Sequence, residues 1–358
     1  FIAGIAKTDF NNRIKIKAVP LLYILTFIGM MILESLYIPL ARRMRIGLHP
    51  ASRHMSRNFT PAGGGIIFVA AGAVFAFIDP DAVSTPFFNG LLIGALLLAC
   101  ISFIDDIYGL PPIARLITQL GVMSYMFSSL LRPETLDIFL IIVIGGAGLV
   151  NAFNFLDGIN GMLTLYAIVV ISTLIAALHC GTIAAFPADS ILGTFSPQQT
   201  STMLSLILCS LVAFLFFNFR SKALVFSGDV GSIFTGFVIT VVLICICIGS
   251  RTAAPAVFVA VFAVDSFLTI IHRLFEGEQI MQPHRRHLYQ HFAHNIGVPH
   301  LSVSSAYAAL QAGINACYFL IPAQQRITYA LIVYLALVST YFRLRSYKRR
   351  DNQQKFQK

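Results

Sequence analysis

The sequence predicts an all-α, polytopic integral membrane protein with about ten or eleven transmembrane helices. Of its 358 residues 57% are hydrophobic and only 11% are charged, and the mean hydropathy is +0.80. Soluble domains usually carry about 25% charged residues, so this composition excludes a water-soluble enzyme and a disordered protein. At about 20 apolar residues per span, no room remains for a sizeable soluble domain. Any chemistry must therefore lie in loops or at helix ends.

Eleven apolar stretches are the candidate spans. They lie at residues 19–40, 63–78, 88–104, 113–131, 138–153, 161–178, 202–218, 231–250, 254–271, 302–321 and 327–342. The chain accordingly divides into an N-terminal segment of open placement (1–18), one transmembrane domain (19–342) with a long loop at 272–301, and a basic tail (343–358). No internal repeat stands out, which argues against a transporter built of inverted repeats.

The basic residues predict the orientation. Eighteen Lys and Arg residues lie in the tail and in the loops that follow odd-numbered spans, whereas the opposite loops carry only Arg132, Arg251 and Arg326. The positive-inside rule places the first set in the cytoplasm. An odd number of spans then places the N-terminus outside, although the positive-inside rule would place the basic residues of 1–18 in the cytoplasm. Either the other loops determine the orientation despite these residues, or residues 1–18 are an amphipathic helix in the membrane plane or an unusual start. The net charge of +10 thus points to anionic membrane lipid and not to nucleic acid.

Two adjacent carboxylates, Asp105 and Asp106, end the third apolar stretch. A charge next to the hydrocarbon is costly, so such residues are functional candidates. The pair suits a divalent cation, or a division into a base and a metal ligand. The alternative is a solvated acidic turn before Pro111 and Pro112.

Two further polar loops follow apolar stretches predicted to end in the cytoplasm. Residues 151–161 contain Asn151, Asn154, Asp157 and Asn160, with glycines that permit a tight turn or close approach of a ligand. Residues 225–232 place Asp229 at the start of a helix, where free backbone N–H groups suit a phosphate and the carboxylate suits its neutralising metal. Ordinary turn formation and a plain N-cap are the respective alternatives.

The loop at 272–301 holds six of the nine histidines. The spacing of His284, His287 and His291 predicts one helical face, beside Arg285 and Arg286. This pattern suits a zinc site, a phosphate clamp or a surface charge run. Because arginines repel a cation and bind a diphosphate bidentately, the clamp is favoured.

Arg57 and the glycine turn at 63–65 complete the predicted cytoplasmic face, as ligand contacts or as a simple helix entry. Asp265 lies deep in the ninth span, and we interpret it as a structural acid satisfied inside the bundle, the alternative being a proton-coupling acid. The six cysteines include no CxxC pair and read as small core residues.

Taken together, these loops resemble the polyprenyl-phosphate N-acetylhexosamine-1-phosphate transferases. Five blocks match in family order over residues 40–300: TPAGGG at 60–65, DDIYGLPPIARLITQ at 105–119, NAFNFLDGING at 151–161, VFSGDVGSIFTG at 225–236 and HRRHLYQHF at 284–292. The run from Asp265 to this last block looks most like the branch that initiates O-antigen or capsule glycans. The departures are Ala62, where relatives often carry Arg, Asn160, where many carry Asp, and the region of Ser56, where relatives often carry a histidine.

The resemblance implies transfer of a sugar-1-phosphate from a UDP-N-acetylhexosamine to undecaprenyl phosphate, with Mg²⁺ (Mn²⁺ as the alternative) and release of UMP. It implies an enzyme of the bacterial inner membrane with its active site on the cytoplasmic face, and a homodimer. The implied roles are Asp229 and Asn154 as metal ligands and Asp105 and Asp106 preparing the lipid phosphate. Asn151, Asp157, Asn160 and Arg57 bind substrate, with Asp157 and Asn160 meeting the uridine. His284, Arg285, Arg286 and His287 bind the diphosphate.

Three rival functions remain beside this one. Phospho-N-acetylmuramoyl-pentapeptide transferase is the alternative within the same family, although that branch typically carries three consecutive histidines where this chain does not. A membrane transporter predicts polar residues near the midplane of broken helices. A noncatalytic scaffold has no need for polar residues from four loops on one face.

Overall fold

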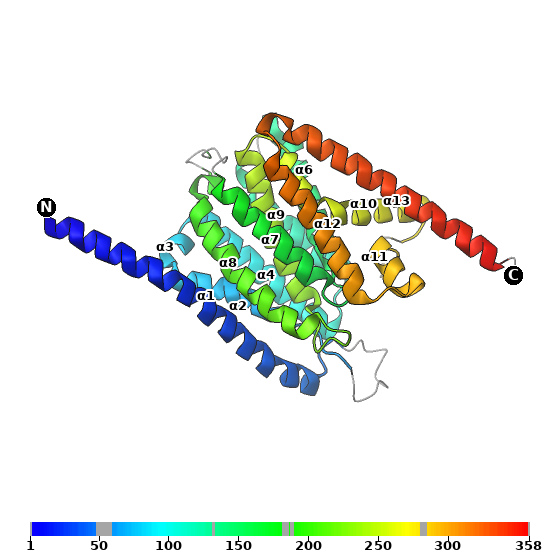
Figure 1. Cartoon of the computed structure of the whole chain (residues 1–358), viewed down its shortest axis with the longest axis horizontal. Coiled ribbons are helices and arrows are strands. Elements are labelled where there is room, and N and C mark those ends of the chain that lie inside the picture. The colour runs from blue at the N-terminus through cyan, green and yellow to red at the C-terminus, as the bar shows by residue number, and fades with distance from the viewer. Residues whose placement is uncertain are drawn as a thin grey trace.

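The computed structural model describes residues 2–47, 59–130, 133–180, 186, 190–279 and 285–356, with side chains described only between residues 20 and 345. Within these ranges the chain forms helices and connecting turns, and no strand. The helices are α1 (Ile2–Met44), α2 (Ile66–Ile78), α3 (Pro80–Val83), α4 (Pro86–Tyr108), α5 (Pro112–Met126), α6 (Leu136–Leu156), α7 (Met162–His179), α8 (Pro197–Asn218), α9 (Gly228–Gly249), α10 (Ala260–Phe275), α11 (Leu288–Gln290), α12 (His300–Leu320) and α13 (Arg326–Phe356). The protein is thus an all-α polytopic membrane protein (Figure 1).

Each of the eleven apolar stretches coincides with one of these helices. Eight segments in the described part of the chain are long and apolar enough to cross a membrane: Pro20–Met44, Pro86–Tyr108, Pro133–Leu156, Met162–His179, Pro197–Asn218, Gly228–Gly249, Ala254–Phe275 and Ala323–Arg345. The other three fall short for different reasons. Helices α2 and α5 have only 13 and 15 residues, and α12 has 21 residues but alternates apolar with polar side chains.

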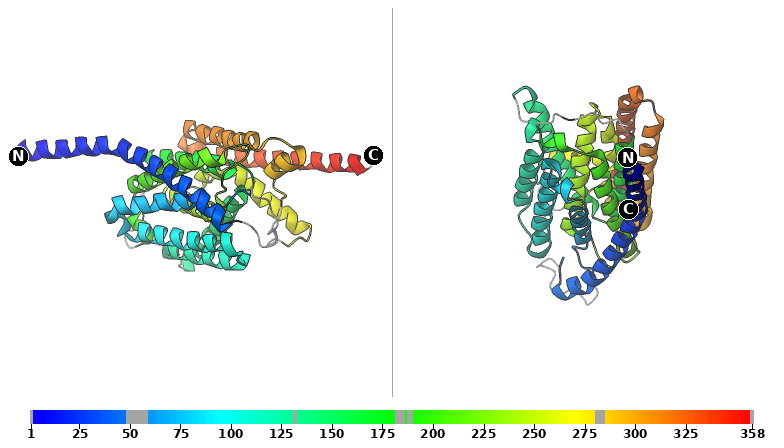
Figure 2. Two further views of the ribbon diagram at one scale, coloured as in Figure 1. Left: turned by 90° about the horizontal axis from the view of Figure 1, so that it is seen from below. Right: turned by 90° about the vertical axis from the view of Figure 1, so that its left-hand side faces the viewer.

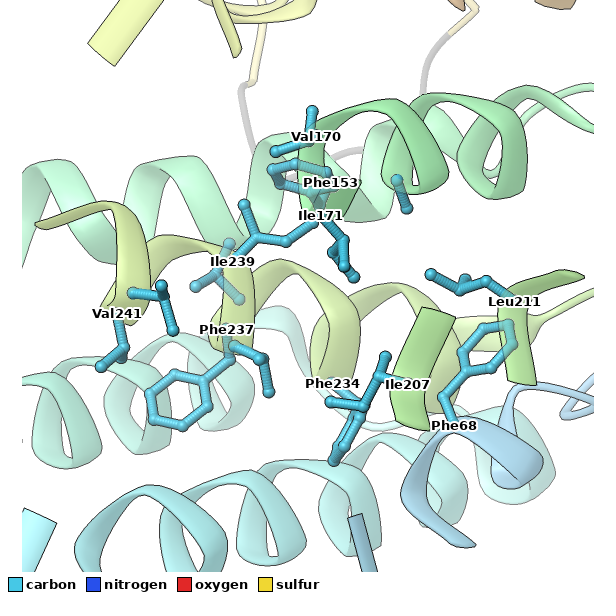
Figure 3. Packing of buried hydrophobic residues seen from close by; sticks show 14 of the residues in the cluster. Phe68, Phe153, Val170, Ile171, Ile207, Leu211, Phe234, Phe237, Ile239 and Val241 are labelled. Atoms are coloured by element: carbon cyan, nitrogen blue, oxygen red, sulfur yellow. The ribbon is translucent and has the colours of Figure 1, made fainter. Parts of the chain in front are cut away.

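Helix α9 is the centre of the bundle. In its most apolar window 83% of the residues are buried, against 28% in α1 and 17% in α13, which lie at the periphery. Figure 3 shows why: Ile239 and Phe234 of α9 lie among apolar side chains of α2, α6, α7 and α8, and Phe237 points to the other side, toward Gly94 of α4. A helix that is apolar all round is stable only when it is enclosed in this way.

The two ends of the chain lie apart. In Figures 1 and 2 the N-terminal part of α1 and the C-terminal part of α13 extend beyond the bundle on opposite sides. Helix α1 is continuous from Ile2 to Met44, so the segment 1–18 joins the first span without a break in the helix.

The glycine turn at 63–65 packs backbone to backbone against the start of α9. Gly64 N–H donates to the Phe226 carbonyl (3.0 Å), Gly65 N–H to the Ser227 carbonyl (2.9 Å), and Phe226 N–H to the Pro61 carbonyl (2.8 Å). A Cβ at position 65 would lie 2.7 Å from the Gly231 nitrogen and 2.9 Å from the Ser227 oxygen. The motifs at 60–65 and 225–236 are therefore two halves of one contact, which fixes where α9 begins.

We expect Gly65→Ala to destabilise the protein by about 1–3 kcal/mol, the usual cost of overpacking, because the atoms it meets are backbone and cannot rotate away. Thermal unfolding followed by circular dichroism in detergent measures this. Gly148→Ala is the matched control, since a Cβ at that position meets nothing within 4 Å. Equal melting temperatures for the two variants would contradict the proposed contact.

Candidate active site

Four carboxylates from three helices meet where α9 begins. Asp105 and Asp106 lie in the last turn of α4, Asp157 directly follows α6, and Asp229 is in the first turn of α9. These four residues come from three separate motifs of the sequence. The predicted gathering of polar residues at one end of the bundle is thus observed for the carboxylates.

Two of the carboxylates cap α9. Asp106 accepts hydrogen bonds from the backbone N–H groups of Asp229 (2.9 Å) and Val230 (3.2 Å), and Asp157 accepts from Gly228 N–H (3.1 Å). Anionic groups at a helix N-terminus are favoured by its unpaired donors and its dipole. The prediction that these N–H groups are free for a phosphate is therefore wrong, because carboxylates of α4 and of the α6–α7 turn occupy them.

Gly228 makes this capping geometrically possible. Its φ is +71°, and a Cβ there would lie 2.5 Å from Asp106 Oδ2 and 2.6 Å from the Gly63 nitrogen. The left-handed backbone and the lack of a side chain both favour glycine at this position.

Arg115, in the first turn of α5, joins the other two carboxylates. Its Nη1 lies 2.8 Å from Asp105 Oδ2 and also contacts Asp229 Oδ2. Asp105 in turn accepts from the Leu110 N–H, which closes the turn between α4 and α5. Sequence reasoning did not single out Arg115 as a site residue. The available signal was an arginine in the first turn of a helix, ten residues after an acidic pair.

The asparagines of the second loop face these groups from α6. Asn154 Oδ1 accepts from the Ser232 hydroxyl (3.0 Å), one turn after Asp229 on α9. Asn151 donates to Gln119 Oε1 and to the Ala147 carbonyl (2.9 Å), and Gln119 lies one turn after Arg115 on α5. The structure thus brings the predicted residues Asn151 and Asn154 to the same end of the bundle, and adds Gln119.

Asn160 has internal partners. It is buried, donates to the backbone carbonyls of Arg220 (2.7 Å) and Ser221 (3.3 Å), and its own carbonyl accepts from Ser304. These contacts join the α6–α7 turn to the α8–α9 turn and to α12. The amide of Asn160 therefore fixes the α6–α7 turn in this structure.

The oxygen ligands at α9 fit a hard cation in kind, because Mg²⁺ prefers carboxylate and amide oxygens. Nonetheless, the described residues contain no group of three His, Cys, Asp or Glu side chains arranged to hold a metal ion. In this structure Arg115 pairs with Asp229 and Asp105. The donor chemistry of the carboxylates and of Asn154 suits Mg²⁺ in kind.

The basic loop lies beyond α10. Arg286 pairs with both Glu276 and Glu278, and Arg273 Nε donates to Glu278 (2.9 Å). Pairing with Arg286 and His272 outweighs the effect of partial desolvation and holds the pKa of Glu276 below its usual value. Arg285 is exposed, whereas Arg57 and His284 lie outside the described residues.

His287 does not share a helical face with His291, as the spacing predicts, because α11 begins only at Leu288 and His287 is its N-cap. Its side chain is 1% exposed and stacks on Tyr289, with ring centroids 5.9 Å apart. Phe155 and Phe262 also lie against it.

Asp265 organises this loop. It accepts hydrogen bonds from the backbone N–H groups of Leu288 (2.8 Å) and Tyr289 (3.4 Å) and from the hydroxyls of Tyr307 (3.2 Å) and Thr269 (3.3 Å). Tyr341 of α13 lies 3.0 Å from the Thr269 hydroxyl. The interpretation of Asp265 as a structural acid satisfied within the bundle agrees with these contacts.

We expect Asp265→Ala to release the segment 285–292. One hydrogen bond to a charged group contributes about 1.5–3 kcal/mol, so amide exchange of Leu288 and Tyr289 should accelerate at least about tenfold. Hydrogen–deuterium exchange with peptide-level mass spectrometry checks this. Ser266→Ala is the control, since the Ser266 hydroxyl is buried without a hydrogen-bond partner. Unchanged exchange in Asp265→Ala would remove the organising role.

Burial raises the pKa of Asp157 to about 7, the nearby Asp229 charge adds to this, and the bond from Gly228 N–H only partly offsets it. A folded-state pKa above the ordinary value of 3.8 means that stability is present below about pH 4 and is lost as the pH rises through 7. In EDTA we therefore expect the melting temperature to fall less between pH 4.5 and 8 in Asp157→Asn than in the wild type. Parallel curves for the two proteins would contradict this.

Comparisons with known proteins agree with the geometry. The chain is 23% identical to a probable undecaprenyl-phosphate N-acetylglucosaminyl 1-phosphate transferase of Bacillus subtilis (74% of this chain, 76% of the relative). It is 24% identical to a decaprenyl-phosphate N-acetylglucosaminephosphotransferase of Mycobacterium leprae (74% of each chain). It is 29% identical to a phospho-N-acetylmuramoyl-pentapeptide-transferase of Shouchella clausii (62% of this chain, 73% of the relative). Residues 88–247, which contain all four clustered carboxylates, match the model of glycosyl transferase family 4. This match over residues 88–247, together with the relatives, indicates a membrane-embedded sugar-phosphate transferase that is similar to glycosyl transferase family 4.

Proposed function

We propose that the protein transfers an N-acetylhexosamine-1-phosphate from a UDP-sugar to undecaprenyl phosphate on the cytoplasmic face of the bacterial inner membrane. The products are undecaprenyl-diphosphate-sugar and UMP, and the reaction is the first membrane step of O-antigen or another cell-surface polysaccharide. The observation that carries the proposal is the meeting of Asp105, Asp106, Asp157 and Asp229 with Arg115 at the start of one buried helix. Charged groups beside hydrocarbon are retained for function.

The reaction moves one phosphoryl group. An oxygen of the lipid phosphate attacks the phosphorus that carries the sugar, and the bond from that phosphorus to the bridging oxygen breaks with UMP as the leaving group. The charge that develops on the phosphoryl oxygens must be stabilised by donors fixed in place beforehand. Mg²⁺, or Mn²⁺, held by Asp229 and Asn154 would supply part of that stabilisation when bound.

The acidic pair divides its work in this proposal. Both carboxylate oxygens of Asp106 accept hydrogen bonds from backbone N–H groups of α9, so Asp106 positions Asp229. Asp105 pairs with Arg115 across the α4–α5 turn and is only 10% exposed in its side chain. We assign Asp105 to accept the proton of the lipid phosphate or to align it, with Asp106 as the residue that fixes the geometry.

The donor is assigned to the opposite side of the site. Arg285 and Arg286, with His284, bind the diphosphate of the nucleotide, and Arg57 adds a further positive charge. His287 was predicted to join them, but its side chain is buried against Tyr289, so we assign it to positioning this segment. Asp157 and Asn160 stand at the α6–α7 turn for the uridine, with Asn160 acting through the 220–221 backbone that it holds. Asn151 of α6 holds α5 in place through its hydrogen bond to Gln119.

The glycan-initiating reaction is favoured over phospho-N-acetylmuramoyl-pentapeptide transfer, which is the second candidate. Arg286 is held between Glu276 and Glu278, in the loop where the two branches differ. The two N-acetylglucosamine-phosphate transferases cited above match 74% of this chain, against 62% for the muramoyl-type relative. A transporter or a scaffold is disfavoured because the clustered carboxylates lie at helix ends and not at mid-span.

The test is transfer of labelled sugar-1-phosphate from a panel of UDP-N-acetylhexosamines to undecaprenyl phosphate by the purified protein, with and without Mg²⁺. The panel includes UDP-N-acetylmuramoyl-pentapeptide. We expect Mg²⁺-dependent product and released UMP with an N-acetylhexosamine donor. In Asp229→Asn the rate should fall by about 10²–10³, the usual cost of losing one charge-stabilising group.

Asp137→Asn is the matched control, because Asp137 is an exposed carboxylate in the first turn of α6, at the opposite end of that helix. It should retain the wild-type rate. Turnover of the muramoyl-pentapeptide donor alone would move the assignment to the second candidate. Absence of product from every donor, with folded protein and an active relative alongside, would reject the transferase reaction.

A further inference from the structure

We propose that Arg115 is a displaceable counter-ion. Its guanidinium pairs with Asp229, the carboxylate that would hold the divalent cation, and with Asp105, and it weakens cation binding until it is displaced. The inference rests on the proposed function, in which Asp229 is a cation ligand. It concerns which group neutralises the carboxylates of that site before the cation binds.

The geometry is that of a bridging cation. A single nitrogen, Nη1 of Arg115, contacts Oδ2 of Asp105 and Oδ2 of Asp229, which come from the end of α4 and the start of α9. Asp229 would be a ligand of the proposed Mg²⁺, so the arginine and the metal would compete for Asp229 Oδ2.

The charges explain why a positive group beside these carboxylates is favourable. Asp106 and Asp157 are committed to the N–H groups of α9, and Asp105 and Asp229 stand beside them. Two carboxylates without a positive neighbour repel one another strongly in a partly desolvated site. Arg115, with 21% of its side chain exposed, supplies the positive charge from within the chain.

Arg115 is also placed so that it can leave. It lies in the first turn of α5, behind Pro111 and Pro112, and the described structure gives its guanidinium no hydrogen bond or ion pair outside Asp105 and Asp229. A change of side-chain rotamer frees it without moving the helix. The freed guanidinium is then available to donate to a phosphate oxygen of a substrate, the anion that its fork of donors fits best.

The test measures Mn²⁺ binding to the full chain in detergent, without substrates, from the free-ion signal in electron paramagnetic resonance. Removing one positive charge beside the site should make Arg115→Gln bind Mn²⁺ at least about tenfold more tightly than the wild type. Arg115→Lys keeps the charge and should bind like the wild type. Arg220→Gln is the matched control, since Arg220 is exposed and its side chain bonds only the Phe216 carbonyl.

A second measurement uses the wild type alone, in case Arg115→Gln does not fold. Phenylglyoxal modifies unpaired arginines, so Mn²⁺ should accelerate the labelling of Arg115 in peptide mass spectra, whereas a ligand ordinarily protects. Equal or weaker Mn²⁺ binding in a folded Arg115→Gln, or labelling slowed by Mn²⁺, would overturn the inference.

The two proposals fail separately. Tighter Mn²⁺ binding in Arg115→Gln together with no sugar-phosphate transfer from any donor would reject the proposed reaction and retain the counter-ion. Transfer activity with no Mn²⁺ bound by either protein would retain the reaction and reject the counter-ion.

Discussion

The structure depends on the need to satisfy the first backbone N–H groups of a helix that is enclosed by other helices. Helix α9 begins inside the bundle, where its first donors would be costly to leave unpaired. Asp106 and Asp157 satisfy them from α4 and from the α6–α7 turn. The glycines at 63–65 and at 228 allow the backbones to approach closely enough for this. Placing those two carboxylates places Asp105 and Asp229 as well.

Two arginines, Arg115 and Arg286, are each held by a pair of carboxylates within the chain. Arg115 lies between two aspartates and Arg286 between two glutamates, so each has anionic partners within the chain before any phosphate arrives. Such pairing fixes the long arginine side chains in place. If a substrate binds to them, the ion pairs within the chain must first break, which costs free energy. The basic groups of both regions are therefore held in ion pairs within the chain.

The fold was predictable from hydropathy, because each span must be apolar over its length, and all eleven apolar stretches coincide with helices. The clustering of Asp105, Asp106, Asp157 and Asp229 followed from placing helix ends on one side. The pairing within the cluster could not be predicted, since a carboxylate that caps its own helix and one that caps a neighbouring helix have the same local sequence. Arg115 was missed because its partners, Asp105 and Asp229, come from two other helices. The shared helical face expected for His287 and His291 was wrong because Asp265, more than twenty residues away, binds the Leu288 N–H and the helix begins there; His284 lies outside the described residues.

The loop after α10 is tied to the C-terminal helix through side chains. Arg345 donates to Tyr341 (2.5 Å), Tyr341 contacts Thr269, and Thr269 and the Leu288 N–H both bond Asp265. This chain of contacts limits how the protein can diversify. A loop grafted from a relative would arrive without its anchor unless the facing residues of α10 and α13 came with it. The conformation of the loop is thus inherited together with those of two helices, and recombination within that unit is disfavoured.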